Sequence, residues 1–203
     1  MTLAERLRAA LSQGHQRPDM IALSEMRDPR IRGDMALAPA AVLVAVTDRS
    51  EPGIILTQRS SKLRQHPGQI AFPGGRVDEG DADEIAGALR EAQEEIGLPP
   101  DKADVVGMTD RYHSFTGFDI VPVLAVIPPD LPLQAQEAEV ADWFEVPIAF
   151  AFDPANQLRR EMIFEGRARP YYEISWEGRR IWGITAAIIV NLSRRLGYDR
   201  QAA

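Results

Sequence analysis

Three glutamates and an arginine stand close together near the middle of the chain, at Arg90, Glu91, Glu94 and Glu95. On a helix, which turns by about 100° per residue, the three glutamates gather on one side. Carboxylates spaced in this way repel one another in an isolated helix. Arg90 is the one base beside this cluster, so the remaining negative charge favours binding of a hard divalent cation. Mg²⁺ or Mn²⁺ suits such oxygen ligands best. The alternative is a solvated acidic face, which glutamate runs usually form.

The helix that would carry these residues is predicted by its apolar side and by its end. Ile85, Leu89, Ala92 and Ile96 fall within roughly 60° of one another in projection, which gives a stripe suited to packing on a sheet. Gly97 is typical of the residue that ends a helix.

A turn is predicted just before this helix, at Pro73, Gly74 and Gly75. Glycines let the backbone come close to a ligand, so a carbonyl oxygen of this turn would be able to join the carboxylates. Arg59, Lys62, Arg64 and His66 lie upstream of it, where they would meet phosphate groups. A solvated loop is the alternative for these four residues.

These residues resemble the Nudix hydrolases. The family's box has a Gly, a spacer, and then a pattern that matches Arg90, Glu91, Glu94, Glu95 and Gly97. The chain departs from the general box at Asp81, where the family has Glu, and its spacer to Arg90 is one residue longer.

This departure is similar to the coenzyme A pyrophosphatase branch of the family. The upstream signature of that branch also resembles residues of this chain, which are Leu56, Thr57, Arg59, Ser60, Leu63, Arg64, His66, Gly68, Ile70, Phe72, Pro73, Gly74 and Gly75. The likeness extends more loosely over roughly residues 36–192.

The resemblance implies the Nudix fold, a mixed α/β (α+β) protein arranged as an α/β/α sandwich with a mixed central sheet. It also implies hydrolysis of the pyrophosphate bond of coenzyme A or acyl-CoA, giving 3′,5′-ADP and 4′-phosphopantetheine or its acylated form. Mg²⁺ or Mn²⁺ would be the cofactor, held by Glu91 and Glu95 with Glu94 and the carbonyl of Gly75 in support.

The remaining roles follow from the same resemblance. Glu94 or Glu139 would take a proton from the attacking water, and Arg90 would orient the glutamates. Arg64 or a neighbour, with Arg59 and His66 as candidates, would bind substrate phosphate. In Nudix proteins a Glu just before a strand often reaches the metal, and Glu139 matches that pattern better than Glu137.

Two rival functions stay open. The box sets the reaction and not the leaving groups, so ADP-ribose, NADH or a nucleoside triphosphate is an alternative substrate. A nucleotide-binding protein without catalysis is a rival of another class. Such a protein would be free to lose one of the residues Arg90, Glu91, Glu94 and Glu95, so the presence of all four argues against it.

Composition narrows the class of protein further. With 203 residues, 45% of them hydrophobic and 26% charged, the chain suits one globular domain, which we predict at residues 36–203 after an N-terminal helix and arm at 1–35. A net charge of −7 argues against broad nucleic-acid binding. The sequence has no apolar run of about 18 residues, so we expect no membrane span and a cytoplasmic protein. A homodimer is one option for the oligomeric state.

The apolar and turn patterns predict the other elements. A helix is expected at residues 3–11, with Thr2 and Glu5 as a capping box, and an irregular basic arm at 12–36. Strands are expected at 40–47, 54–58, 105–109, 120–127 and 143–147. A hairpin is expected from 159–164 and 171–176, followed by a turn into 179–182, and a helix is expected at 183–196.

Overall fold

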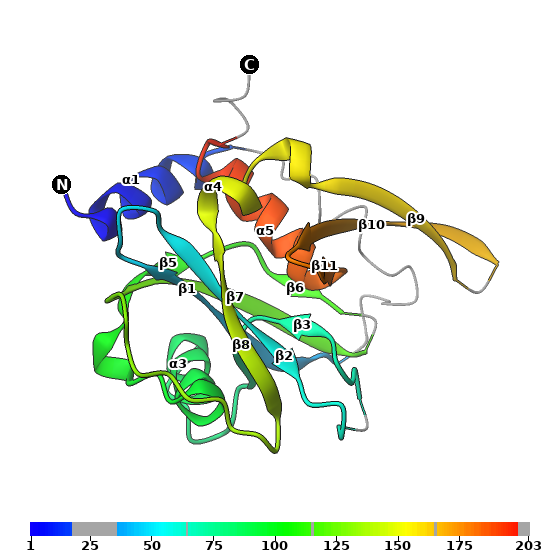
Figure 1. Cartoon of the computed structure of the whole chain (residues 1–203), viewed down its shortest axis with the longest axis horizontal. Helices are drawn as coiled ribbons and strands as arrows, with labels where there is room; N and C mark the ends of the chain where they lie inside the picture. The colour runs from blue at the N-terminus through cyan, green and yellow to red at the C-terminus, as the bar shows by residue number, and fades with distance from the viewer. Residues whose placement is uncertain (18–35, 64, 115, 165, 199–203) are drawn as a thin grey trace.

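The protein is seen here in a computed structural model, which describes residues 1–17, 36–63, 65–114, 116–164 and 166–198 (Figure 1). Its main element is an eight-stranded mixed sheet, and a separate three-stranded sheet lies beside it. In chain order the elements are α1 (Leu3–His15), β1 (Ala38–Thr47), β2 (Gly53–Arg59), β3 (Ile70–Ala71), β4 (Gly74–Arg76), α3 (Glu84–Ile96), η1 (Pro100–Lys102), β5 (Asp104–Met108), β6 (Tyr112–His113), β7 (Phe118–Ile127), β8 (Val140–Pro147), α4 (Ile148–Ala151), η2 (Pro154–Asn156), β9 (Leu158–Phe164), β10 (Arg167–Trp176), β11 (Arg179–Trp182) and α5 (Ile184–Arg195).

Strand β1 is the centre of the main sheet. It is nearly all apolar and pairs in parallel with β7 along its whole length, as expected of a strand that is covered on both faces. The sheet runs in the order β3-β2-β1-β7-β5. In addition, β4 pairs with β1, β6 pairs with β7, and β8 pairs with β2. The mixed central sheet predicted from the sequence is therefore confirmed.

Helices cover the two faces of this sheet (Figure 1). Side chains alternate along β1, so Ala41, Leu43 and Ala45 pack against α3, where Ala88 and Ala92 let the helix approach closely. The other face carries Val44 and Val46, and packs with the apolar sides of α1 and α5. The three-stranded sheet, in the order β11-β10-β9, lies on this second side, and its β9–β10 hairpin projects from the body.

Strands β1 and β2 separate from each other, and this separation makes room for the site. They pair only at Val46 and Ile54, after which β4 takes the place beside β1 and β3 takes the place beside β2. The turn predicted at residues 73–75 was wrong in part, because Gly74–Arg76 forms β4. Gly74 has φ of 152°, and a Cβ there would come within 2.4 Å of the Ala41 carbonyl oxygen. A glycine is therefore needed for this close approach to β1.

Most predicted elements are present, with shifted ends. Thr2 and Glu5 form the expected capping box on α1, and Gly97 ends α3 in the left-handed region with φ of 67°. The basic arm lies mostly outside the described residues, at 18–35, so the division of the chain at residue 35 stays a prediction. Among the described helices, none is long and apolar enough to cross a membrane.

Candidate metal site

Glu95 is the most buried carboxylate of the predicted cluster, with 5% of the residue exposed. The last turn of α3 places it beside β4, where its Oε2 accepts a hydrogen bond of 3.2 Å from the Gly74 backbone N–H. Burial raises the pKa of Glu95 to about 7, against the lowering effect of that hydrogen bond. The sequence pattern placed all three glutamates on the side of the helix opposite its apolar stripe, so this degree of burial was not predicted.

Glu91 lies one turn earlier on α3 and touches the second glycine of β4. A Cβ on Gly75 would come within 2.7 Å of the Glu91 carboxylate, so this contact requires glycine. The Glu91 side chain is 16% exposed, and burial raises its pKa above the usual value. The carboxylates of Glu91 and Glu95 therefore face the two glycines of the same short strand.

Arg90 is fixed by a set of acceptors around it. Its Nε and Nη2 donate to the two oxygens of Asp81, at 3.0 and 3.1 Å, and Nη2 also donates to the Arg76 carbonyl at 3.0 Å. The Arg90 guanidinium holds the pKa of Asp81 below its usual value. Asp81, noted in the sequence only as a departure from the family's box, is thus the partner that sets the direction of Arg90.

The same guanidinium reaches the carboxylates on its own helix. Arg90 Nη1 lies 3.1 Å from Glu94 Oε2, and Nη2 lies 3.1 Å from Glu91 Oε1. Glu94 has a side chain that is 59% exposed, so of the three helix glutamates it is the one that faces solvent. The structure therefore brings Arg90, Glu91 and Glu94 into one charged group, with Glu95 behind it.

The loop that carries Glu139 is attached to the end of α3. Gln134 and Gln136 donate backbone hydrogen bonds of 2.9 and 2.8 Å to the carbonyls of Ile96 and Glu95. The negative charge of Glu139 adds to the effect of burial in raising the pKa values of Glu91 and Glu95. The glutamines that make this attachment carry no sequence signal of a site, and sequence reasoning missed them.

The predicted phosphate-binding residues differ in how close they lie to the glutamates. Arg59, at the end of β2, is close enough to lower the pKa of Glu95, and its buried Nε has no hydrogen-bond partner in the part of the chain that the structure describes. His66 is exposed on the following loop, with a positive φ of 54°. Arg64 lies outside the described residues.

The donor set suits a divalent ion. Carboxylate oxygens are the ligands that Mg²⁺ and Mn²⁺ prefer. Burial, and after it the charge of neighbouring carboxylates, raises the pKa values of Glu91 and Glu95, and a bound cation would favour their charged forms. In the described ranges no three His, Cys, Asp or Glu side chains form a ready-made group. Glu91 and Glu95 would hold a divalent ion, with Glu94 or Glu139 as the candidate for a further ligand.

A mixed sheet with an acidic helix packed against a pair of glycines defines a class of metal-using α/β enzyme. The NUDIX domain profile matches residues 37–165, and the chain belongs to the Nudix family. It is 44% identical over 172 residues to the "Uncharacterized Nudix hydrolase NudL" of Cronobacter sakazakii, covering 85% of this chain and 90% of that protein. The protein of the same name from Escherichia coli is 41% identical over 180 residues, covering 88% and 94%.

Among solved structures, a Nudix hydrolase from M. smegmatis, RenU, is similar with a TM-score of 0.48 and 22% identity, over 55% of this chain and 71% of that one. The family assignment itself comes from the sequence matches. The chain is therefore a pyrophosphohydrolase of the Nudix family, whose members generally use divalent metal ions and act on small nucleotide-derived substrates.

Proposed function

We propose that this enzyme hydrolyses the diphosphate of coenzyme A or acyl-CoA, giving 3′,5′-ADP and 4′-phosphopantetheine or its acylated form. One observation carries the proposal. The segment that resembles the coenzyme A signature, from Leu63 to Gly75, leads through β3 directly into β4, where Gly74 and Gly75 touch Glu95 and Glu91. The segment proposed to recognise the substrate is thus continuous in the chain with the candidate metal site.

In this proposal the carboxylates of Glu91 and Glu95 hold Mg²⁺ or Mn²⁺, with Glu94 and the carbonyl of Gly75 in support. The bound ion would neutralise charge on the diphosphate and make a water molecule a better nucleophile. Burial of Glu95 removes competing water from the side of the site nearest β4.

The other residues position groups or move a proton. Glu94 or Glu139 accepts the proton of the attacking water, because each is an exposed carboxylate beside the buried pair. Arg90, fixed by Asp81, keeps Glu91 and Glu94 in place. Arg59, which lies close to Glu95, is proposed together with Arg64 and His66 to bind substrate phosphate.

Product analysis tests the proposal. The pure protein is incubated with Mg²⁺ or Mn²⁺ and, in separate reactions, with coenzyme A, ADP-ribose, NADH and a nucleoside triphosphate, and the products are separated by chromatography. Release of 3′,5′-ADP, fastest from coenzyme A, is the expected result. Faster cleavage of another substrate would leave the metal site and overturn the coenzyme A assignment, and no cleavage with either ion would favour a nucleotide-binding protein.

A further inference from the structure

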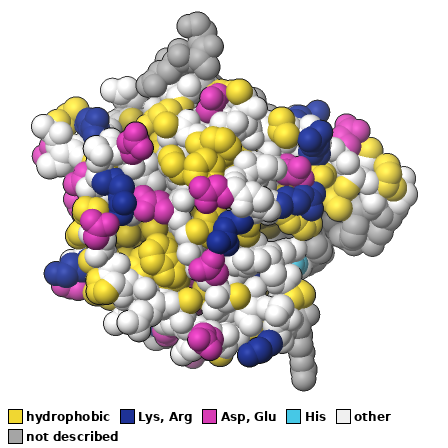
Figure 2. Space-filling model, viewed as in Figure 1, with side chains coloured by type: hydrophobic (Ala, Val, Ile, Leu, Met, Phe, Trp, Pro, Cys, Tyr) yellow, Lys and Arg dark blue, Asp and Glu magenta, His cyan; other side chains and the backbone are white. Residues whose placement is uncertain are grey.

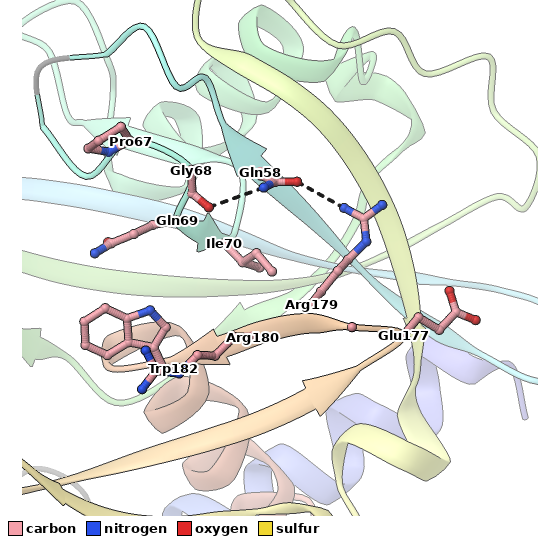
Figure 3. A pocket seen from close by; sticks show the side chains of 10 residues that line it. Gln58, Pro67, Gly68, Gln69, Ile70, Glu177, Arg179, Arg180 and Trp182 are labelled. Atoms are coloured by element: carbon pink, nitrogen blue, oxygen red, sulfur yellow. Dashed lines mark hydrogen bonds between the residues drawn. The ribbon is translucent and has the colours of Figure 1, made fainter.

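A pocket of about 660 Å³ lies between β2–β3 and the three-stranded sheet (Figure 3). Its volume is within the range of sites for small molecules, roughly 300–1,000 Å³. Its lining includes Gln58, Gly68, Glu177, Arg179, Arg180 and Trp182. Arg179, Arg180 and Trp182 come from β11, more than a hundred residues after β2 in the chain.

Hydrogen bonds hold the two walls of the pocket in place. The Gln58 side-chain amide donates to the Gly68 carbonyl at 3.5 Å, and its oxygen accepts from Arg179 at 3.3 Å, so this one side chain spans both walls (Figure 3). Arg179 also donates to Asp142 at 2.7 Å. A Cβ added at Gly68 or Gly178 would meet nothing within 4 Å, so both glycines border open space.

The lining combines positive charge with an aromatic ring. The segment 158–182, which forms the three-stranded sheet, has six arginines and four glutamates, although the whole chain has a net charge of −7. Figure 2 shows dark-blue side chains gathered where this sheet joins the body. The Arg180 guanidinium lies 4.8 Å from the centre of the Trp182 ring and donates to Glu173 at 2.6 Å.

These groups match a phosphorylated aromatic base. An indole offers a stacking surface, and guanidinium groups prefer phosphate oxygens. The Arg180 side chain is 52% exposed. Its partner Glu173 is 14% exposed, and Arg180 also donates to the Tyr171 hydroxyl at 3.0 Å. A guanidinium has five N–H donors, so a phosphate would share Arg180 with these groups rather than replace them.

The pocket is also close to the candidate metal site along the chain. Its wall at Gly68 precedes Gly74 by six residues, which span at most roughly 20 Å even when fully extended. Gln58, which lines the pocket, is followed directly by Arg59 at the end of β2. A ligand that reaches from the site to the pocket therefore needs an extended, dinucleotide-like shape.

We infer that this pocket is the subsite for the 3′-phosphoadenosine end of the substrate, with the base on Trp182 and the 3′-phosphate on Arg180 and Arg179. The inference rests on the proposed function for the identity of the substrate. In this assignment, β11 and the turn before it make the enzyme prefer nucleotides that carry a 3′-phosphate.

Arg180→Gln tests the phosphate contact, with Arg160→Gln as the matched control. Arg160 has the same 52% exposed side chain and also pairs with Glu173, but it does not line the pocket. Steady-state KM and kcat are measured for coenzyme A and for dephospho-coenzyme A, which lacks the 3′-phosphate. In Arg180→Gln we expect KM for coenzyme A to rise about tenfold and KM for dephospho-coenzyme A to change less than about twofold.

The control should change neither value. An equal rise for both substrates in Arg180→Gln, or the same rise in Arg160→Gln, would overturn the phosphate contact. Trp182→Leu tests the base contact separately, and it should raise KM for both substrates alike because both carry adenine. A loss confined to coenzyme A in Trp182→Leu would contradict the placement of the base.

Calorimetric titration keeps this inference distinct from the proposed function. With Mg²⁺ present, 3′,5′-ADP should bind the unmodified protein more tightly than 5′-AMP does, and Arg180→Gln should abolish the difference. If coenzyme A is not hydrolysed and this preference is still found, the proposed function fails and the subsite stands. Equal binding of the two nucleotides, or no binding of either at millimolar concentration, would overturn the subsite.

Discussion

Glu95 combines burial, a backbone hydrogen bond and neighbouring negative charge in one carboxyl group. Glu95→Gln keeps the side-chain volume and the acceptor for the Gly74 N–H but removes the charge. We expect turnover to fall by roughly a hundredfold or more, because a neutral amide is a poor ligand for a hard cation.

Circular dichroism should show that the Glu95→Gln variant is folded. Glu137→Gln, on the loop before β8, is the control, and it should keep activity within about twofold because Glu137 is exposed and lies outside the cluster. Activity retained by Glu95→Gln would remove Glu95 from the proposed metal site.

The raised pKa of Glu95 also makes stability depend on pH. In the folded protein its pKa is about 7, against an ordinary value of 4.5, so between these pH values the folded state holds a proton that the unfolded state has lost. Protonated Glu95 favours the folded state, and this contribution to stability is complete below pH 4.5 and is lost as pH rises toward 7. For the metal-free protein in a chelator, the Glu95 contribution to the free energy of unfolding should fall by about 3 kcal/mol across this window.

Urea unfolding at several pH values measures this dependence, and comparison with Glu95→Gln isolates it. The variant should lose this component of the slope and should be relatively more stable at pH 7. Parallel curves for the two proteins would show that Glu95 has an ordinary pKa in the folded state.

At the scale of elements, Gly97 fixes where α3 ends. Its φ is 67°, and a Cβ there would meet nothing closer than 3.8 Å, so the cost of a substitution is confined to the backbone. Gly97→Ala should lower the free energy of unfolding by about 1 kcal/mol. Chemical denaturation measures the loss, and Gly97→Asn should lose less because asparagine tolerates this conformation better. An alanine variant as stable as the parent would contradict this role.

The sequence predicted α3 well and the short strands poorly, for a physical reason. Periodic apolar residues and a glycine cap are local signals, and they were enough to place α3 and its C-terminal end. Strands β3 and β4 exist because β1 and β2 separate and leave pairing positions for them. Two or three residues carry no periodicity of their own, so residues 73–75 suggested a turn.

The site shows the same limit. The acidic pattern picked out Glu91, Glu94 and Glu95 as candidates, but it placed Glu95 away from the apolar side of the helix. Its burial comes from β4 and from the loop that Gln134 and Gln136 attach to the helix end. The pocket depends on contacts between residues 58–70 and 177–182, which no spacing within either segment predicts.

At the scale of the whole molecule, a buried ion pair connects the two ends of the chain. Arg195 of α5 donates to both oxygens of Asp110 at 2.7 Å, and Asn191 donates to the same carboxylate. Arg195 Nη1 also donates to the carbonyls of Gly14 and Arg17, at the end of α1. Although burial opposes it, this pairing holds the pKa of Asp110 below its usual value.

Arg195→Met should therefore destabilise the entire fold. It leaves the Asp110 carboxylate half-buried without its cation and removes the donors to α1, so we expect the free energy of unfolding to fall by about 3–5 kcal/mol, with a lower Tm. Arg8→Met is the control, because the Arg8–Asp104 pair is short, at 2.8 Å, but has side chains that are 45% and 61% exposed. Exposed pairs contribute about 1 kcal/mol or less, so this variant should melt close to the parent. Equal losses in the two variants would mean that burial does not set the strength of the Arg195 contact, and that α1 and α5 are joined mainly by their apolar sides.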